Sequence, residues 1–409
     1  MKKIGIYLVF MALISSCSES YKKYKQGVWH AEISVQNKAI PFQMEIKNQN
    51  GKMSWVIINA DERITLDTFL INGDSIEVPM HIFDATLKAV NYGDSIKGFF
   101  VKNYADDYVL PFSAKFGDSK RFHVSNPPIV NITGKYGVIF MKNDKTTVPA
   151  IGIFNQNEEK VTATFLTKTG DYRFLEGVLD GNVLRLSGFD GEHVYLFEAK
   201  VDSLGDLQGE FWSGKSGYRT WIGVKNEKAK LPNPNSLTYL KKGYDKIEFS
   251  FPNMNQKMVS LNDEKYKGKA VIVQILGSWC PNCMDETAFL SDWYRNNKDK
   301  NVEIIGLAYE LKPDFNYAKS RVEIMKKRYN IDYEILIAGE GNTKSASASL
   351  PMLNEVISFP TTIFIAKTGE IVKIHTGFSG PSTGDYYDEF ISDFNATILK
   401  MTTENETDN

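Results

Sequence analysis

The side chains of this sequence best suited to redox chemistry are two cysteines with two residues between them, Cys280 and Cys283 in Trp279-Cys280-Pro281-Asn282-Cys283. The apolar run Ala270–Leu276 before them predicts a buried strand, and a helical pattern follows them. Pro281 suits the first helical position, where its missing N–H group leaves no bond unmade. Cys280 then lies at the helix N-terminus, where unpaired N–H groups and the helix dipole favour a nucleophilic thiolate. Cys283, one turn deeper, would resolve the mixed disulfide that Cys280 forms with a substrate.

Two other roles for this cysteine pair are open. A zinc site needs two more ligands at related spacing, whereas the sequence adds only Cys17 near the N-terminus and five scattered histidines. A purely structural disulfide would close too short a ring to constrain much chain entropy. We therefore predict no metal and no cofactor, only a redox-active dithiol and disulfide.

A second feature lies downstream, where Phe359-Pro360-Thr361-Thr362 leads into the apolar run Ile363-Phe364-Ile365. Proline has no N–H group for a sheet ladder, so Pro360 should start this strand. Taken alone it would be an ordinary trans proline, because only about one X–Pro bond in twenty is cis in folded proteins.

Together, the two motifs and the strand order around them resemble the thioredoxin fold, specifically the TlpA/ResA-like thiol-disulfide oxidoreductases of bacterial envelopes, over residues 245–400. The resemblance implies that Pro360 is a cis proline whose loop packs against the Cys280 sulfur and whose neighbouring backbone pairs with substrate. It also implies a set of active-site neighbours: Trp279, Pro281, Asn282, Phe359 and Thr361. Further matching stretches are Phe249-Ser250-Phe251-Pro252-Asn253, Val259-Ser260-Leu261 and Lys267-Gly268-Lys269.

Glu286 matches an acidic residue that tunes the active-site thiols in this subfamily, although a solvated glutamate in a first helical turn is the alternative. Two positions depart from the family pattern. Gln274 stands where thioredoxins carry a buried acid, so proton uptake by Cys283 must use Glu286 or water. Ser358 and Phe359 stand where a glycine and a smaller residue often precede the proline, which alters the expected substrate groove.

The remaining periodicity of this region agrees with the resemblance. A helical stripe follows Cys283, and residues 302–308 predict a buried strand. Ala318, Val322, Met325 and Tyr329 form an amphipathic stripe that fits the helix inserted in this subfamily, with a strand at 333–338 after it. Lys367-Thr368-Gly369-Glu370 predicts a hairpin turn, and a last helix precedes a polar tail at 401–409.

The N-terminus indicates export. Met1-Lys2-Lys3 and the apolar residues 4–14 have the pattern of a signal peptide, here 1–16, that is too short to span a membrane. Ile14-Ser15-Ser16-Cys17 resembles a lipoprotein lipobox, which implies that Cys17 is lipidated and begins a tether at 17–26. By the same resemblance, Ser18 favours the outer over the inner membrane. We therefore expect a lipid-anchored protein of the bacterial cell envelope that faces the periplasm.

Composition limits the other classes. The chain has 409 residues, 42% of them hydrophobic and 24% charged, which allows more than one core. A net charge of -2 gives no electrostatic basis for binding nucleic acid. Apart from Cys17 the only cysteines are those of one motif, which indicates redox work rather than a disulfide-stapled scaffold.

Residues 27–226 lack a long helical stripe and contain short alternating runs, so we expect two tandem β-rich, meander or barrel-like units at 27–125 and 131–226. Three residues of one copy match three of the other at one constant offset: Pro41, Lys52 and Gly73 with Pro149, Lys160 and Gly181. A proline-containing linker at 227–244 separates these units from the redox domain, which makes the chain an α+β multidomain protein. Four tryptophans of the β units either fill cores or line a cavity: Trp29, Trp55, Trp212 and Trp221.

The main prediction is an envelope enzyme that exchanges thiols and disulfides in exported proteins. By resemblance we favour reduction, with electrons from a membrane-embedded thiol donor and with substrates such as apocytochromes c or oxidatively damaged proteins. A thiol peroxidase is disfavoured because the Pro-x-x-x-Thr-x-x-Cys pattern is absent from the sequence. A non-enzymatic binding lipoprotein with a vestigial redox domain is the other alternative, and the intact cysteine pair and Pro360 speak against it.

Overall fold

The computed structural model describes residues 24–403. The predicted signal peptide and Cys17 therefore lie outside the described residues. Between residues 24 and 403 there is no helix whose length and apolar character would allow it to cross a bilayer.

The first β unit is one antiparallel, nine-stranded sheet in the order β4-β3-β2-β1-β9-β8-β7-β6-β5. Alternating residues of its strands are buried, so side chains on one face fill a core that holds Trp29 and Trp55. Its strands are β1 (Gly27–Val35), β2 (Lys38–Gln49), β3 (Lys52–Asn59), β4 (Glu62–Leu66), β5 (Leu70–Asn72), β6 (Ser75–Pro79), β7 (Ala85–Asn91), β8 (Ser95–Lys102) and β9 (Val109–Phe116).

The second β unit repeats this order strand for strand, because β10 to β18 occupy the places of β1 to β9. It differs in one pairing: β12 bonds to both β11 and β14, which closes the sheet into a barrel around an aromatic core. Its strands are β10 (Gly134–Met141), β11 (Thr147–Asn157), β12 (Lys160–Thr167), β13 (Gly170–Asp171), β14 (Leu175–Asp180), β15 (Val183–Phe189), β16 (Val194–Val201), β17 (Leu207–Ser213) and β18 (Gly217–Lys225).

The residues matched in the sequence lie at equivalent places of the two units. Lys52 and Lys160 begin β3 and β12, and the prolines lie within β2 and β11. Gly98 and Gly209 each pair with an alanine, where a side chain would collide with the neighbouring strand. The prediction of two tandem β units is thus confirmed. All four tryptophans are buried, as the core interpretation expects.

The C-terminal domain has a five-stranded sheet in the order β23-β22-β21-β24-β25, in which β21, β22 and β23 are parallel and β24 runs antiparallel to both β21 and β25. All seven residues of β21 are buried. Its elements are β19 (Ser250–Pro252), β20 (Met258–Ser260), β21 (Ala270–Leu276), α2 (Pro281–Asn296), β22 (Val302–Glu310), α3 (Phe315–Tyr329), β23 (Glu334–Glu340), α4 (Thr343–Ser349), β24 (Thr361–Ile365), β25 (Ile371–Thr376) and α5 (Asp385–Thr402).

One expected boundary shifts. The sequence predicts a polar tail from residue 401, but α5 continues to Thr402 and buries Met401 against the domain core. An apolar side chain at a buried helical position continues the helix past the point where the sequence becomes polar.

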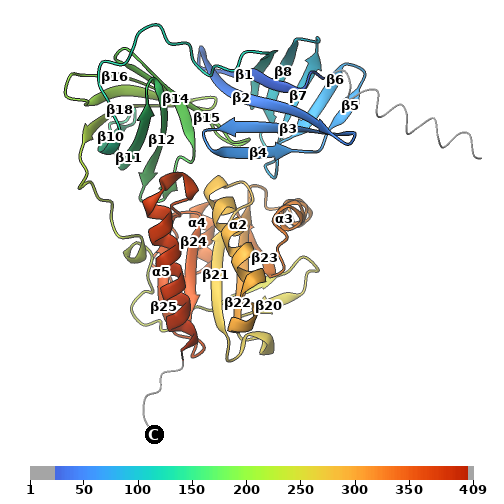
Figure 1. Ribbon diagram of the computed structural model, residues 1–409. Helices are drawn as coiled ribbons and strands as arrows, with labels where there is room; N and C mark the ends of the chain where they lie inside the picture. The colour runs from blue at the N-terminus through green and yellow to red at the C-terminus, as the bar shows by residue number, and fades with distance from the viewer. Residues whose placement is uncertain (1–23, 404–409) are drawn as a thin grey trace, which may run out of the picture.

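Both β units lie on one end of the C-terminal domain, next to each other (Figure 1). The first unit contacts α3, where the Tyr317 hydroxyl donates to Asp84 at 2.9 Å and Arg328 donates to the Thr65 carbonyl at 2.7 Å. The second contacts α5, where Lys135 donates to the Tyr386 hydroxyl at 2.6 Å. This end of the domain is where the motif helix α2 begins.

Candidate active site at the junction of three units

The cysteine motif lies where the sequence places it, between the end of β21 and the first turn of α2. Cys280 is the N-cap of α2 and its sulfur accepts a hydrogen bond of 3.2 Å from the Cys283 backbone N–H. The two cysteines form a disulfide with their Cα atoms 5.2 Å apart. Cys283 is fully buried, whereas Cys280 keeps 7% of its surface exposed. Only the first sulfur is therefore placed to meet another molecule.

The loop before β24 forms the other wall of the site. The Phe359–Pro360 peptide bond is cis, the isomer that the resemblance implies, and the Phe359 carbonyl oxygen lies 3.5 Å from the Cys280 sulfur. Thr361 donates to the Ser358 carbonyl at 2.9 Å and closes this turn. The Trp279 indole packs edge-on against the Phe359 ring and donates to the Tyr309 carbonyl at 2.9 Å.

Glu286 lies beneath the motif and is buried, with 1% of its surface exposed. The alternative of a solvated glutamate is therefore wrong. Its carboxylate accepts hydrogen bonds of 2.8 Å from the Gln274 amide and from the Thr362 hydroxyl, two residues directly opposite on β21 and β24. Burial raises the pKa of Glu286 to about 7, and these two bonds oppose the rise only in part. The carboxyl thus exchanges its proton near neutral pH.

Sequence reasoning missed a second buried carboxyl, Glu310, at the end of β22. It accepts 2.9 Å and 2.7 Å hydrogen bonds from the backbone N–H and the hydroxyl of Ser278, two residues before Cys280. Burial raises its pKa to about 7 as well. The position of Glu310 near the motif could have been inferred from the expected sheet topology, because the parallel strands β21 and β22 end at the same edge of the sheet.

A buried charge cluster joins the three units at the start of α2, and it too was missed. Arg173 of the second β unit donates to the Pro281 carbonyl at 2.9 Å, and it pairs with Asp285 at 2.7 Å and with Glu62 of the first unit at 2.5 Å. Desolvation alone would lower the pKa of Arg173, but the surrounding carboxylates raise it overall. Burial raises the pKa of Asp285 to about 7 despite the paired guanidinium. No spacing in the sequence relates Arg173 to the motif.

The β12–β13 hairpin tip, residues 167–171, covers the rim of the site. Ser358 donates to the Thr169 carbonyl at 2.8 Å. The Asn282 amide pairs with the Asp171 backbone, donating to its carbonyl at 3.2 Å and accepting from its N–H at 2.9 Å. Asn282, at the centre of the motif, is half-buried and contacts the β unit.

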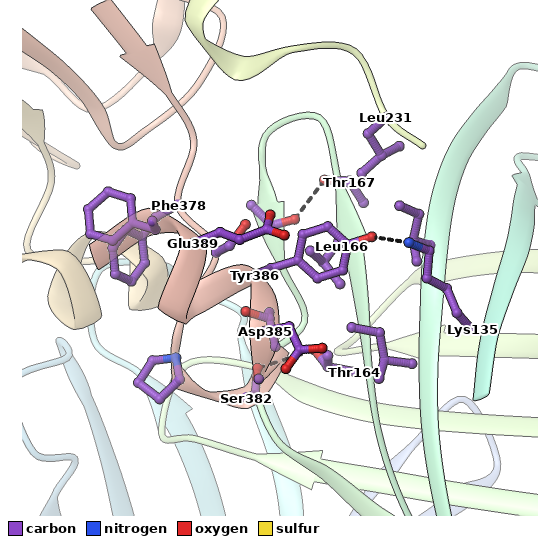
Figure 2. Close-up of a pocket in the computed structure, with 18 of the residues that line it drawn as sticks. Lys135, Thr164, Leu166, Thr167, Leu231, Phe378, Ser382, Asp385, Tyr386 and Glu389 are labelled. Atoms are coloured by element: carbon purple, nitrogen blue, oxygen red, sulfur yellow. Dashed lines mark hydrogen bonds between the residues drawn. The ribbon is translucent and has the colours of Figure 1, made fainter. Parts of the chain in front are cut away.

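An open cleft of about 1190 Å³ lies beside this hairpin, between the second β unit and the C-terminal domain. Figure 2 shows Thr164, Leu166 and Thr167 on one wall, with Tyr386 and Phe378 opposite them. Within residues 24–403, no group of three or more metal-ligating side chains is arranged to hold a metal ion. The cysteine pair is the redox group that this site contains.

The fold of the C-terminal domain and the disulfide at its helix N-terminus define a thiol-disulfide oxidoreductase of the thioredoxin fold. The Redoxin family model matches residues 242–389. The thiol-disulfide oxidoreductase ResA of Bacillus subtilis (strain 168) is 26% identical over 140 residues, covering 34% of this chain and 69% of that protein. ResA of Bacillus cereus (strain ATCC 10987 / NRS 248) is 24% identical over 179 residues, covering 44% of this chain and 88% of that protein.

Similar solved structures also cover the C-terminal domain. A putative thiol:disulfide interchange protein DsbE from Chlorobium tepidum shares 17% identity with a TM-score of 0.30, covering 39% of this chain and 99% of that chain. A thiol-disulfide oxidoreductase from Bacteroides fragilis NCTC 9343 shares 18% identity with a TM-score of 0.27, covering 36% and 99%.

Proposed function

We propose that this protein reduces disulfides in exported proteins, with Cys280 as the nucleophile and Cys283 as the resolving thiol. The observation that carries the proposal is the position of the Cys280 sulfur, which caps α2 and faces the Phe359 carbonyl while Cys283 is fully buried. A sulfur at a helix N-terminus is stabilised as the thiolate, the form that attacks a disulfide.

The reaction has two exchange steps. The Cys280 thiolate attacks one sulfur of the substrate disulfide, so that a Cys280–substrate bond forms and the first substrate thiolate leaves. The Cys283 thiolate then attacks the Cys280 sulfur, forms the Cys280–Cys283 disulfide and releases the second substrate thiolate. The two cysteines supply both electrons, and each substrate thiolate takes up a proton.

Glu286 is the proposed proton acceptor for Cys283. The two residues are three positions apart on α2 and so share one face of the helix. A carboxyl whose pKa is about 7 can accept the thiol proton and return it near neutral pH. Gln274 and Thr362 hold the carboxylate in place.

The setting of this activity is the bacterial cell envelope. We infer from the N-terminal sequence that Cys17 carries a lipid anchor, that the protein faces the periplasm and that the outer membrane is its site. A membrane thiol donor would reduce the Cys280–Cys283 disulfide again after each cycle. Apocytochromes c and oxidatively damaged envelope proteins are the substrates that we favour.

The test is reduction of insulin disulfides with dithiothreitol as the electron source, in a Cys17→Ser background that leaves only the motif thiols. Cys280→Ser is expected to abolish the catalysed rate, and Cys283→Ala to accumulate a mixed disulfide visible as a mass adduct. An undiminished rate in Cys280→Ser would contradict the proposal and return the chain to the class of binding proteins.

A further inference from the structure

We propose that the β12–β13 hairpin tip, residues 167–171, is a movable cover on the substrate-binding rim, and that a protein disulfide reaches Cys280 only after the cover has been displaced. The inference rests on the proposed function, because it concerns how substrate reaches the same sulfur. The occupant of the rim is this segment of the chain itself, and the partner that replaces it is an extended segment of the substrate polypeptide.

The first contact of the cover lies beside the cis-proline loop. The Ser358 hydroxyl donates to the Thr169 carbonyl at 2.8 Å. Gly377, whose N–H donates to the Pro360 carbonyl at 2.9 Å, lies directly against the same peptide unit. A Cβ atom at Gly377 would meet the Thr169 carbonyl carbon at 2.8 Å and its oxygen at 3.0 Å, so only glycine permits this approach.

The second contact lies within the cysteine motif. The Asn282 amide makes two hydrogen bonds to the Asp171 backbone, to its carbonyl at 3.2 Å and from its N–H at 2.9 Å. A Cβ atom at Gly170 would come within 2.8 Å of the Asn282 side-chain amide. The hairpin therefore presents bare backbone to Asn282, as it does to Ser358.

These two contacts lie on two different elements next to Cys280: Asn282 is two residues after it on α2, and Ser358 directly precedes Phe359, whose carbonyl the Cys280 sulfur faces. The side chains of Asn282 and Ser358 both bind main-chain groups of the hairpin. Every polypeptide carries such groups, whatever its sequence. An extended substrate could satisfy the same donors and acceptors. Hairpin and substrate backbone thus compete for one surface, while a small disulfide needs access to Cys280 alone, which keeps 7% of its surface exposed.

The surroundings of the hairpin leave it room to move. The cleft of about 1190 Å³ borders it at Thr167, Lys168 and Gly170. Figure 2 shows Thr167 and Phe378 among the residues that line this cleft. A second hollow of about 440 Å³, in the mouth of the β barrel, borders Thr167, Thr169 and Gly170 from another direction. Lys168 is exposed, and Thr167, Thr169 and Gly170 are half-buried. Asp171 at the base of the tip is buried and its carboxylate accepts a 2.5 Å hydrogen bond from the Gly380 N–H, so opening the cover must pivot on this bond or break it. Segments with few buried apolar contacts open at low free-energy cost.

Gly377→Ala in the full-length chain tests the cover, because the added methyl group pushes against the Thr169 peptide unit. Gly369→Ala is the matched control: it has φ of +88° against +80° at Gly377 and lies in the same domain, but its Cβ would have no heavy atom closer than 3.9 Å. Gly170→Ala is a second variant, on the hairpin itself: its added methyl group would collide with the Asn282 side chain, and the residues of the rim that substrate would contact stay unchanged. The substrates are insulin and oxidised glutathione, measured on the same samples.

The expected result is a rise of about tenfold in the ratio of insulin to glutathione-disulfide reduction for Gly377→Ala, and of about threefold for Gly170→Ala. Gly369→Ala should keep the wild-type ratio. An unchanged ratio in both Gly377→Ala and Gly170→Ala overturns the cover while leaving the proposed function intact. Loss of Cys280-dependent reduction of both substrates in the unmodified chain would instead remove the proposed function. If Gly377→Ala does not fold, Gly170→Ala decides the question.

Hydrogen exchange gives an independent readout. A model peptide with one cysteine, linked by a disulfide to Cys280 in the Cys283→Ala protein, should displace the hairpin and speed exchange of the amides of residues 168–171. The β14–β15 turn around Gly181, on the same barrel, serves as the reference segment. Unchanged exchange at the hairpin with the peptide in place would refute the competition for the rim.

Discussion

Arg173 and Pro281 are joined by a 2.9 Å hydrogen bond, from the guanidinium of the second β unit to the carbonyl between the two redox cysteines. Asp285 and Glu62 hold the same guanidinium at 2.7 Å and 2.5 Å. The motif helix therefore begins inside a network to which all three units contribute. The geometry of the redox centre depends on how the units are assembled.

Arg173→Met should be strongly destabilising. Removing one member of a buried ion pair leaves the remaining charges unpaired, which costs about 3 to 5 kcal/mol. Urea denaturation should show a lower transition midpoint and a separate early loss of contact between the units. Arg63→Met provides the control, because Arg63 is exposed nearby on β4 and its loss should cost less than about 0.5 kcal/mol. Equal midpoints for the two variants would contradict this role of the network.

Glu286→Gln should flatten the dependence of stability on pH. The folded pKa of Glu286 is about 7 and its ordinary value is 4.5, so the folded state binds more protons than the unfolded state between these values. The free energy of unfolding therefore falls as pH rises through this window, by about 3 kcal/mol for this group. Between pH 4.5 and 7, the free energy of unfolding of Glu286→Gln should therefore fall by about 3 kcal/mol less than that of the wild type. Exposed Glu264→Gln should leave the slope as in wild type.

The same Glu286→Gln variant separates the chemistry from the fold. The introduced side-chain amide can accept from Gln274 and donate to Thr362, so the local bonds can be kept while the proton exchange is lost. We expect insulin reduction to fall by about a hundredfold, together with its dependence on pH around 7. The mixed disulfide with Cys280 should form at the wild-type rate and resolve slowly, because Glu286 serves Cys283. A wild-type resolution rate would rule out the carboxyl as proton acceptor.

Ser278→Ala should show what Glu310 does for the motif. The substitution removes the 2.7 Å hydroxyl bond and leaves the 2.9 Å backbone bond to the Glu310 carboxylate. A hydrogen bond to a charged group contributes about 1.5 to 3 kcal/mol, and this loss should appear in urea unfolding of the oxidised protein above pH 7, where the Glu310 carboxyl is ionised. Ser260→Ala, at a partly exposed serine on the β20 edge of the same domain, is the comparison and should cost less than about 1 kcal/mol.

Gly98→Ala and Gly209→Ala should be destabilising to a similar degree. A Cβ atom would come within 2.0 Å of the Lys88 carbonyl in the first case and within 2.1 Å of the Glu198 carbonyl in the second. Overpacking of this kind costs about 1 to 3 kcal/mol, measured by thermal unfolding. The residue before each glycine is exposed, so Lys97→Ala and Gln208→Ala are near-neutral controls. If alanine is tolerated at only one of these two positions, the two β units do not pack alike there.

The C-terminal domain could be predicted from the sequence because its pattern is local. Ala270–Leu276 is apolar throughout apart from Gln274, and such a run is typical of a strand buried on both faces. The stripe Ala318, Val322 and Met325 is the buried face of α3. The position of the motif cysteines followed directly from these neighbours.

The environment of the site could not be predicted in the same way. Arg173 belongs to a turn of a β unit, and only the assembled fold brings it to Pro281. The burial of Glu286 could not be predicted for the same reason, because it depends on Gln274 and Thr362 from strands outside its own helix. Local patterns report which face of an element is apolar, but they do not report what covers the remaining face.

The duplicated β units bring equivalent turns to the same place. Glu62 opens β4 in the first copy and Gly170 opens β13 in the second, and both neighbourhoods meet the start of α2. The first unit contributes a carboxylate and the second contributes bare backbone, so structurally equivalent loops of the two units serve different purposes at the site. Comparisons of relatives that align the redox domain alone will overlook them, because Arg173 precedes the motif carbonyl by 108 positions.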